Sequence, residues 1–527
     1  MNHQWDFPYA SNRAPLFARN IVATSQPLAA QAGLQMLQRG GNAVDAALAT
    51  AITLTVVEPA MNGLGSDAFA IVWDGSELHG LNASGRSPAA WTPERFASSV
   101  KMPLLGWDSV TVPGAVSGWV ALSDRFGNLP FADLFAAAIG YAQTGFQVGH
   151  KTAAVWQQSK TVYAAFPAFM QTFMPNGRAP QTGELVRLPH HAGTLAKIAA
   201  SKGEDFYRGE LAEEIIRDCE RHGGAMALDD LAEHRAQWVT TISQEYRGVT
   251  LHEIPPNGQG LLALIALGIL AWRDIGQYPL DSADSIHLQI EAIRLAYADI
   301  ERHLADPDYM TRSVQDLLDR EYLKERSKQI RMRRASPALS KVPASPDTVY
   351  LTTADQSGMM VSFIQSNYVG FGSGVVVPDT GISLQNRGYG FTLEEGHPNQ
   401  VGGGKRPYHT IIPGFVTRND QALMSFGVMG GHMQAQGHVQ MMVRIFDYGQ
   451  NPQTASDAPR WHLYEDGRVG VESGFDAKVA AKLARRGHEI IYDNEARVFG
   501  GAQLISRLED GYCGASDHRK EGQAVGY

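Results

Sequence analysis

The segment Pro346-Asp347-Thr348-Val349-Tyr350 decides the interpretation of this chain. It follows residues 335–346, which are rich in Pro, Ser and Ala and are typical of an exposed linker. Residues 348–354 and 359–366 alternate in polarity on either side of Asp355-Gln356-Ser357-Gly358, which predicts a β-hairpin. A threonine therefore begins a predicted strand directly after a stretch of chain that is open to cleavage.

Cleavage before Thr348 would give this residue a free α-amine. The usual pKa of such an amine, about 7.7–8.0, suits a base near neutral pH. The amine can activate the hydroxyl of the same residue, so that one residue supplies both nucleophile and base. The β-branched side chain has few χ1 rotamers, which helps to place the oxygen. Together with Gly430-Gly431, at a predicted turn from strand to helix, Thr348 fits an N-terminal nucleophile.

The composition indicates a globular protein and argues against several functions. The chain has 527 residues, of which 44% are hydrophobic and 19% charged, and its net charge of -9 lacks the basic bias of nucleic-acid-binding proteins. Its two cysteines cannot build a disulfide framework. The apolar runs are too short for a membrane span, and the first residues do not resemble a secretory signal. We therefore expect a soluble, cytoplasmic protein without nucleic-acid or membrane partners.

Other chemical motifs are weak or missing. Gly402-Gly403-Gly404-Lys405 lacks the spacing of a phosphate-binding loop, and no G-x-S-x-G elbow occurs. His190-His191, His432 and His438 are candidate metal ligands by residue type alone, without a motif such as H-E-x-x-H. We therefore expect hydrogen-bonding or surface roles for these histidines, and no metal or organic cofactor.

Several elements can be predicted from local signals. Ser25 is a candidate N-cap of a helix that starts near Pro27 and stops at Gly40-Gly41. Asn42 opens a second, Ala-rich helix, and residues 286–304 have the pattern of an amphipathic helix.

Seven short motifs extend the interpretation to nearly the whole chain. In order they are Gly40-Gly41-Asn42-Ala43-Val44-Asp45-Ala46-Ala47, Val112-Pro113-Gly114-Ala115, Leu228-Asp229-Asp230-Leu231, Glu291-Ala292 with Ala296-Tyr297-Ala298-Asp299, Asp306-Pro307-Asp308, Phe371-Gly372-Ser373-Gly374 and Gly430-Gly431. In this order they resemble the landmarks of the γ-glutamyltransferases, a family of the N-terminal nucleophile hydrolase superfamily.

The resemblance implies an α+β fold, a four-layer αββα sandwich, and a proenzyme that cuts itself between Asp347 and Thr348. The large subunit would be residues 1–347 and the small subunit residues 348–527, intertwined in one domain. Thr348 would attack an amide carbonyl and form an acyl-enzyme, while backbone N–H groups of Gly430 and Gly431 hold the oxyanion. Ser366, at the family's threonine position, would hydrogen-bond to the Thr348 amine or hydroxyl. Whether the heterodimers pair into a dimer of heterodimers stays open.

The substrate-binding positions depart from the family pattern. Gly390 stands where the family has the aspartate that binds the substrate's α-ammonium. Arg387 replaces a glutamine, and Tyr368 replaces an asparagine. His409-Thr410 replace the paired serines that help to bind the α-carboxylate. Arg86 lies two positions nearer the following proline than the family's arginine does.

These changes remove an anion suited to an ammonium and add a cation suited to a carboxylate. They predict hydrolysis of a small anionic amide that carries a carboxylate and no α-amine. Oxamate, giving oxalate and ammonia, fits best and would belong to purine (urate) nitrogen catabolism. The alternatives are a γ-glutamyl hydrolase or transferase acting on glutathione, a dicarboxyl-amide (glutaryl-type) acylase, and a catalytically silent binding module. Arg387 could instead be structural, paired with Glu394 or Glu395.

Overall fold

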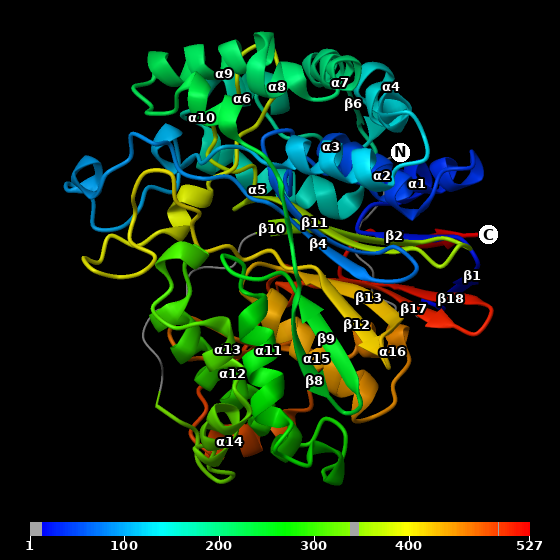
Figure 1. Ribbon diagram of the computed structural model, residues 1–527, viewed down its shortest axis with the longest axis vertical. Helices are drawn as coiled ribbons and strands as arrows, with labels where there is room; N and C mark the ends of the chain where they lie inside the picture. Colours follow the sequence, from blue (N-terminus) through cyan, green and yellow to red (C-terminus); the bar gives the residue numbers. More distant parts are fainter. Residues whose placement is uncertain (1–12, 338–346, 494) are drawn as a thin grey trace.

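Two seven-stranded antiparallel sheets face each other at the centre of the molecule, as the computed structural model shows for residues 13–337, 347–493 and 495–527 (Figure 1). The first sheet has, in spatial order, β19 (Gln523–Gly526), β2 (Ile21–Thr24), β10 (Asp347–Ala354), β11 (Met360–Tyr368), β3 (Asp67–Trp73), β4 (Leu78–Ala83) and β7 (Gln237–Val239). The second has β1 (Leu16–Ala18), β18 (Gly511–Ser516), β17 (Gly501–Leu508), β13 (Gln421–Met429), β12 (Gly414–Arg418), β9 (Val249–Glu253) and β8 (Ile242–Tyr246).

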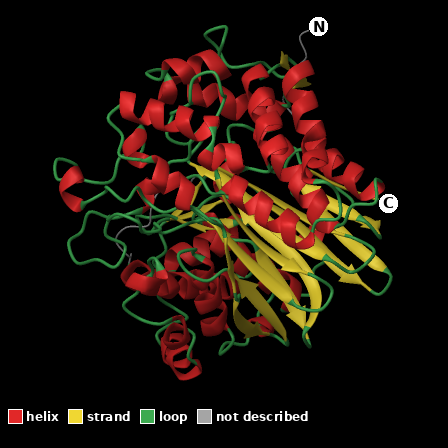
Figure 2. Ribbon diagram, turned by 45° about the horizontal axis from the view of Figure 1, so that its top comes forward, coloured by secondary structure: helices red, strands yellow, loops and turns green. Residues whose placement is uncertain are grey.

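Helices cover the outer face of each sheet (Figures 1 and 2). On the side of the first sheet lie α1 (Pro27–Gln38), α2 (Ala43–Val57), α3 (Ala115–Phe126), α4 (Ala136–Thr144), α5 (His150–Tyr163), α6 (Pro167–Phe173), α7 (Pro189–Ser201), α8 (Glu204–Arg208), α9 (Glu210–Arg221) and α10 (Leu228–Glu233). On the side of the second lie α11 (Gly260–Leu270), α12 (Ala283–His303), α13 (Val314–Leu317), α14 (Arg320–Lys328), α15 (Met433–Phe446), α16 (Pro452–Asp457) and α17 (Ala477–Arg485). The predicted αββα sandwich is confirmed.

Smaller sheets complete the fold. They are β14 (Trp461–Leu463), β15 (Val469–Val471) and β16 (Ile490–Tyr492) in one, and β5 (Phe146–Gln147) with β6 (Leu185–Val186) in the other. None of the helices in the described part of the chain combines the length and apolarity that a membrane span needs.

Strand β3 is buried on both faces, which explains its continuous apolar sequence after Asp67. In β3, Phe69 and Ile71 point into the core between the sheets, whereas Ala70 and Val72 point into the core under the helices. This alternation follows from the two-residue period of a strand. Tyr350 of β10 also lies in the core between the sheets, so the strand that has Thr348 as its second residue runs through the middle of the molecule.

Strands from both sides of the expected cut are interleaved. β10 and β11 lie between β2 and β3 in the first sheet, and β12 lies next to β9 in the second. Segments before and after Thr348 therefore share both sheets.

Most local predictions hold, with one correction. The hairpin forms as β10 and β11, and Asn42 caps α2 in a capping box with Asp45. The N-cap of α1, however, is Gln26, whose Oε1 accepts a hydrogen bond from Leu28 N at 2.6 Å. Ser25 instead donates to Glu58 Oε2, because its hydroxyl faces that carboxylate rather than the helix start. Of the predicted linker, residues 338–346 lie outside the described residues.

Candidate functional site

Thr348 lies at a β-bulge between β10 and β11. Asp347 pairs with Tyr368 and Val349 pairs with Gln365, so β11 has one residue more than β10 at this point. Bulges of this kind redirect side chains and are frequent beside active sites. Tyr368, at the end of the bulge, has φ +82°, a backbone conformation that non-glycine residues rarely adopt. Thr348 is 1% exposed.

Two side chains contact the Thr348 hydroxyl. Thr348 Oγ1 donates to Ser366 Oγ at 3.3 Å, and Gln434 Nε2 donates to Thr348 Oγ1 at 3.3 Å. Ser366 Oγ also accepts from Tyr368 N at 2.8 Å, which fixes it within the bulge. The structure thus brings Ser366 to the Thr348 hydroxyl. Gln434 was missed, although it follows Gly430-Gly431 by only three residues.

Gly430 and Gly431 form the turn between β13 and α15, with φ values of +118° and +56°. A Cβ at Gly430 would lie 2.9 Å from Gly500 Cα, so glycine is required for space as well as for conformation. Gly431 O accepts from Gln434 N at 3.1 Å and starts the helix. The turn therefore connects directly to the residue that contacts Thr348. Its role as the oxyanion site stays a prediction.

Arg387 is a buried cation that is only partly hydrogen-bonded. It is 1% exposed, and its Nη1 donates to Thr410 Oγ1 at 3.0 Å. Its guanidinium carbon lies 4.5 Å from the centre of the Tyr368 ring, a cation–π contact. Its Nε and Nη2 have no hydrogen-bond partner among the described residues. Burial lowers its pKa to about 10, so Arg387 stays charged at neutral pH.

The structural interpretation of Arg387 as a partner of Glu394 or Glu395 is wrong. Both glutamates are exposed, and neither forms an ion pair with Arg387 in the part of the chain that the structure describes. Arg387 points into the protein interior instead.

His409 lies beside Asp67, which the sequence analysis did not identify. His409 Nε2 and Asp67 Oδ2 are 3.1 Å apart, and Asp67 Oδ1 accepts from Gly114 N at 3.1 Å. Burial holds the pKa of His409 well below its ordinary value, with a further contribution from the Arg387 charge. The neutral imidazole therefore donates from Nε2 to Asp67. Burial raises the pKa of Asp67 to about 7, although the charge of Arg387 opposes this shift.

Arg86 does not join this group. Its Nη1 donates to Asp306 Oδ2 at 2.9 Å and to Gly404 O at 2.8 Å. No hydrogen bond or ion pair links it to Thr348 or Arg387 among the described residues.

The backbone leaves no space for a side chain at position 390. A Cβ built on Gly390 would lie 2.5 Å from the carbonyl oxygen of Tyr408. The aspartate of the family pattern would therefore require the Tyr408 main chain to move. Tyr408 is in turn held by its ring, which stacks on His432 with centroids 5.7 Å apart.

Further buried polar atoms lack hydrogen-bond partners within the described residues. Tyr368 Oη and His432 Nε2 belong to residues that interact with Arg387, and Glu465 Oε1 belongs to a residue that interacts with Tyr368. Buried polar groups are normally paired, so a group of unpaired ones is typical of a site that a ligand completes. Burial raises the pKa of Glu465 to about 7, with a further contribution from Asp466.

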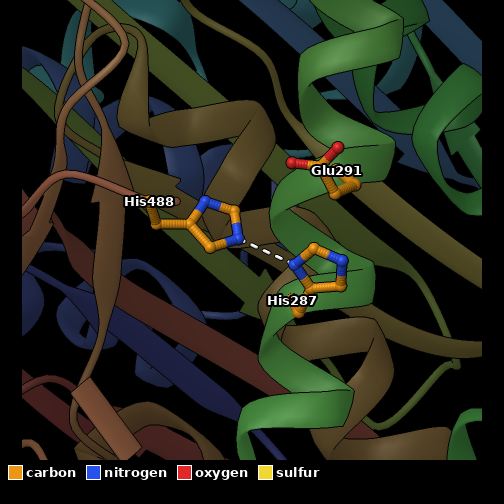
Figure 3. A group of neighbouring side chains, drawn as sticks. All are labelled: His287, Glu291 and His488. Carbon is orange, nitrogen blue, oxygen red and sulfur yellow. Dashed lines mark hydrogen bonds between the residues drawn. The ribbon is translucent and has the colours of Figure 1, made fainter. Parts of the chain in front are cut away.

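His287, Glu291 and His488 form a second polar group, away from Thr348 and close enough together to suggest a metal site (Figure 3). His287 Nε2 lies 3.0 Å from the Arg331 carbonyl, which can only accept, so Nε2 carries the proton. His287 Nδ1 then accepts from His488 Nε2 at 2.7 Å. Glu291 Oε2 accepts from Ser336 N at 2.9 Å. Hydrogen bonds inside the protein thus engage both ring nitrogens of His287, whereas Glu291 Oε1 and His488 Nδ1 have no hydrogen-bond partner among the described residues.

A threonine that begins a central strand of an αββα sandwich, beside a glycine turn, defines the class of the protein. It is an N-terminal nucleophile hydrolase. The gamma-glutamyltranspeptidase family matches residues 29–527, and the chain belongs to this family. It is an amidohydrolase made as a proenzyme that gives a large and a small subunit.

Three relatives illustrate the range of the family. The chain is 36% identical to the glutathione hydrolase-like YwrD proenzyme of Bacillus subtilis, over 98% of this chain and 100% of the relative. It is also 36% identical to the oxamate amidohydrolase proenzyme of Klebsiella pneumoniae, over 95% and 97%. Its structure resembles the cephalosporin acylase from Bacillus halodurans with a TM-score of 0.96 and 48% identity, over 100% and 99% of the two chains.

Proposed function

We propose that the chain cuts itself between Asp347 and Thr348, and that Thr348 then hydrolyses the amide of a small substrate with a carboxylate and no α-ammonium. Oxamate is the substrate that we propose, with oxalate and ammonia as products. The products of the cut, residues 1–347 and 348–527, would stay together as a heterodimer, because both contribute strands to both sheets.

The two guanidinium nitrogens of Arg387 that have no partner among the described residues, Nε and Nη2, carry this proposal. A buried cation with two unsatisfied N–H groups is costly unless an anion completes it. Nε and Nη2 lie on one edge of the planar guanidinium and can bind the two oxygens of a carboxylate together. Thr410 and Tyr368 hold the guanidinium in place through its other edge and its face.

The backbone at Gly390 supports the absence of an α-ammonium. No carboxylate can stand at this position without displacing Tyr408. Asp67, a buried carboxyl that interacts with Arg387, already accepts hydrogen bonds from His409 and from the backbone of Gly114. The surroundings of Arg387 therefore favour a substrate whose charge is negative.

The reaction follows from the chemistry of an N-terminal threonine. The α-amine of Thr348 takes the proton of Oγ, which attacks the amide carbon, while the N–H groups of Gly430 and Gly431 hold the oxyanion. The C–N bond then breaks, and the leaving nitrogen takes the proton from the α-ammonium and departs as ammonia. Water then gives a proton to the α-amine and attacks the resulting ester; the C–Oγ bond breaks, oxalate leaves, and Thr348 Oγ takes the proton from the α-ammonium.

Two alternatives remain, each with its own support. A γ-glutamyl hydrolase or transferase acting on glutathione is favoured by the glutathione hydrolase-like relative and by Glu465, whose unpaired Oε1 could accept from an ammonium. A dicarboxyl-amide acylase is favoured by the likeness to a cephalosporin acylase. The acylase, like the oxamate hydrolase, needs a cation for a carboxylate and no partner for an ammonium.

The test compares three substrates on one preparation. The purified protein and a Thr348→Ala variant are analysed by intact mass and N-terminal sequencing, and then assayed with oxamate, glutathione and a glutaryl amide. We expect two fragments, the smaller beginning at Thr348, and the highest kcat/KM with oxamate. A higher kcat/KM with glutathione or the glutaryl amide would replace the substrate assignment. An uncut wild-type chain would overturn the mechanism.

A further inference from the structure

We propose that Gln434 is a further catalytic residue, which donates a hydrogen bond to Thr348 Oγ when this oxygen leaves the carbonyl carbon. This inference rests on the proposed function of Thr348 as the nucleophile. Gln434 would act during hydrolysis of the ester, because negative charge develops on Oγ in this step.

The orientation of the Gln434 amide is fixed by its surroundings. Its Oε1 accepts from Ile412 N at 3.0 Å, a backbone donor that cannot accept in return. The other end of the amide, Nε2, must therefore face Thr348, where it lies 3.3 Å from Oγ1. Gln434 is fully buried on the first turn of α15, so bulk water does not compete for this contact.

The two neighbours of the Thr348 hydroxyl have complementary roles. Ser366 Oγ accepts the hydroxyl proton, whereas Gln434 donates to a lone pair of the same oxygen. One lone pair of Oγ stays available for bond formation with a carbonyl carbon. Gln434 thus orients the nucleophile before the reaction and contacts the reacting atom throughout.

The donor acts mainly when the ester breaks. As water adds to the acyl-enzyme, it gives a proton to the α-amine of Thr348. The C–Oγ bond then breaks and its electron pair moves to Oγ, which takes that proton back from the α-ammonium. A buried donor at the leaving oxygen stabilises this charge more in the transition state than in the ground state. Without this hydrogen-bond donor, the alkoxide of Thr348 would be a poor leaving group in a buried site.

The same bond breaks during maturation. Thr348 Oγ attacks the Asp347 carbonyl, the peptide C–N bond breaks, and the hydroxyl proton ends on the new α-amine. Water then hydrolyses the internal ester between Asp347 and Oγ. Gln434 would therefore promote the second step of the cut as well as the turnover of substrate.

The experiment uses three full-length variants. Gln434→Glu retains the acceptor for Ile412 N and replaces the donor, whereas Gln434→Met removes both. Gln440→Glu is the matched control, because Gln440 is also buried on α15 and donates from Nε2 to Trp461 O at 3.0 Å, away from Thr348. Precursor cleavage, kcat and KM with the preferred substrate, and hydroxylamine-sensitive ester are measured from pH 6 to 9.

We expect kcat to fall by about 10²-fold in both Gln434 variants, with a smaller change in KM, and ester to accumulate before hydrolysis. The kcat of the Gln434→Glu variant should rise relative to that of the wild type as the pH falls, because a protonated carboxyl can donate a hydrogen bond. Gln440→Glu should keep wild-type kcat. A wild-type kcat in Gln434→Glu at high pH would overturn the proposal. A loss of kcat in the Gln434 variants without accumulation of ester would overturn it as well. An inert wild-type chain would instead overturn the proposed function itself.

Discussion

The guanidinium carbon of Arg387 lies 4.5 Å from the centre of the Tyr368 ring, and both side chains are almost completely buried. Tyr368 ends the bulge that holds Thr348, so the nucleophile and the cation are linked through a single aromatic residue. The nucleophile and the proposed carboxylate site are therefore held by rigid elements at a fixed separation, which favours one length of acyl group over a range of lengths.

Replacing Arg387 should impair substrate binding and spare the cut. Arg387→Met removes a charge-assisted contact worth about 1.5–3 kcal/mol, so kcat/KM for oxamate should fall by about 10- to 150-fold. Arg387→Lys should recover only part of this loss, because an ammonium cannot bind both carboxylate oxygens in a planar pair. Steady-state kinetics and gel analysis of the precursor check the two effects. Unchanged kcat/KM in Arg387→Met would show that the carboxylate binds elsewhere.

A methyl group at position 390 should destabilise the fold. Gly390→Ala brings a Cβ to 2.5 Å from the Tyr408 carbonyl oxygen, and overpacking of this kind costs about 1–3 kcal/mol. Gly193→Ala on α7 is the control, since a Cβ there meets nothing within 4 Å. Gly193→Ala should leave the free energy of unfolding unchanged or raise it by up to about 1 kcal/mol. Denaturant unfolding of both variants measures the difference, and equal stabilities would mean that the backbone near Gly390 yields easily.

The affinity for an anionic substrate should depend on the protonation of Asp67. Burial raises the pKa of this carboxyl to about 7, so it is mainly neutral below pH 7 and ionised above it. Ionisation lowers the positive potential at Arg387, so KM for oxamate should rise as the pH increases through 7. Asp67→Asn should remove this rise and keep KM near its low-pH value. If the variant shows the same pH profile of KM as wild type, Asp67 is not the titrating group.

Sequence patterns identified the parts of the site whose structure depends on residues that are close together in the sequence. The strand after the linker placed Thr348, and the glycine pair placed the turn before α15, because turn and strand signals are short-range. The partners of Arg387 and His409 could not be obtained in this way. Asp67 begins β3, hundreds of residues from His409 in the sequence, and no motif marks it. Gln434 lies beside a recognised motif, yet its contact depends on the bulge in β11.

The contact between His287 and His488 should stabilise the protein across the cut, because the two residues lie on opposite sides of Thr348 in the sequence. Their 2.7 Å hydrogen bond is buried, and His488→Leu would leave His287 Nδ1 without its donor, at a cost of about 1–3 kcal/mol. His518→Gln, a change at a half-exposed histidine, should have little effect and serves as the control. A chelator should not alter the stability of the wild type, since hydrogen bonds engage both ring nitrogens of His287.

The contribution of His488 to the free energy of unfolding changes with pH in a defined direction. Burial lowers the pKa of His488 to about 3, with a further contribution from His287, whereas an unfolded histidine titrates near 6.5. Between these values the unfolded state binds more protons, so His488 lowers stability as the pH falls from about 6.5, by up to about 1.4 kcal/mol per pH unit. The His488→Leu variant should therefore lose less stability than wild type between pH 7 and 5. Thermal unfolding of the processed heterodimer at both pH values measures the difference, and parallel losses would show that His488 is charged in the folded state.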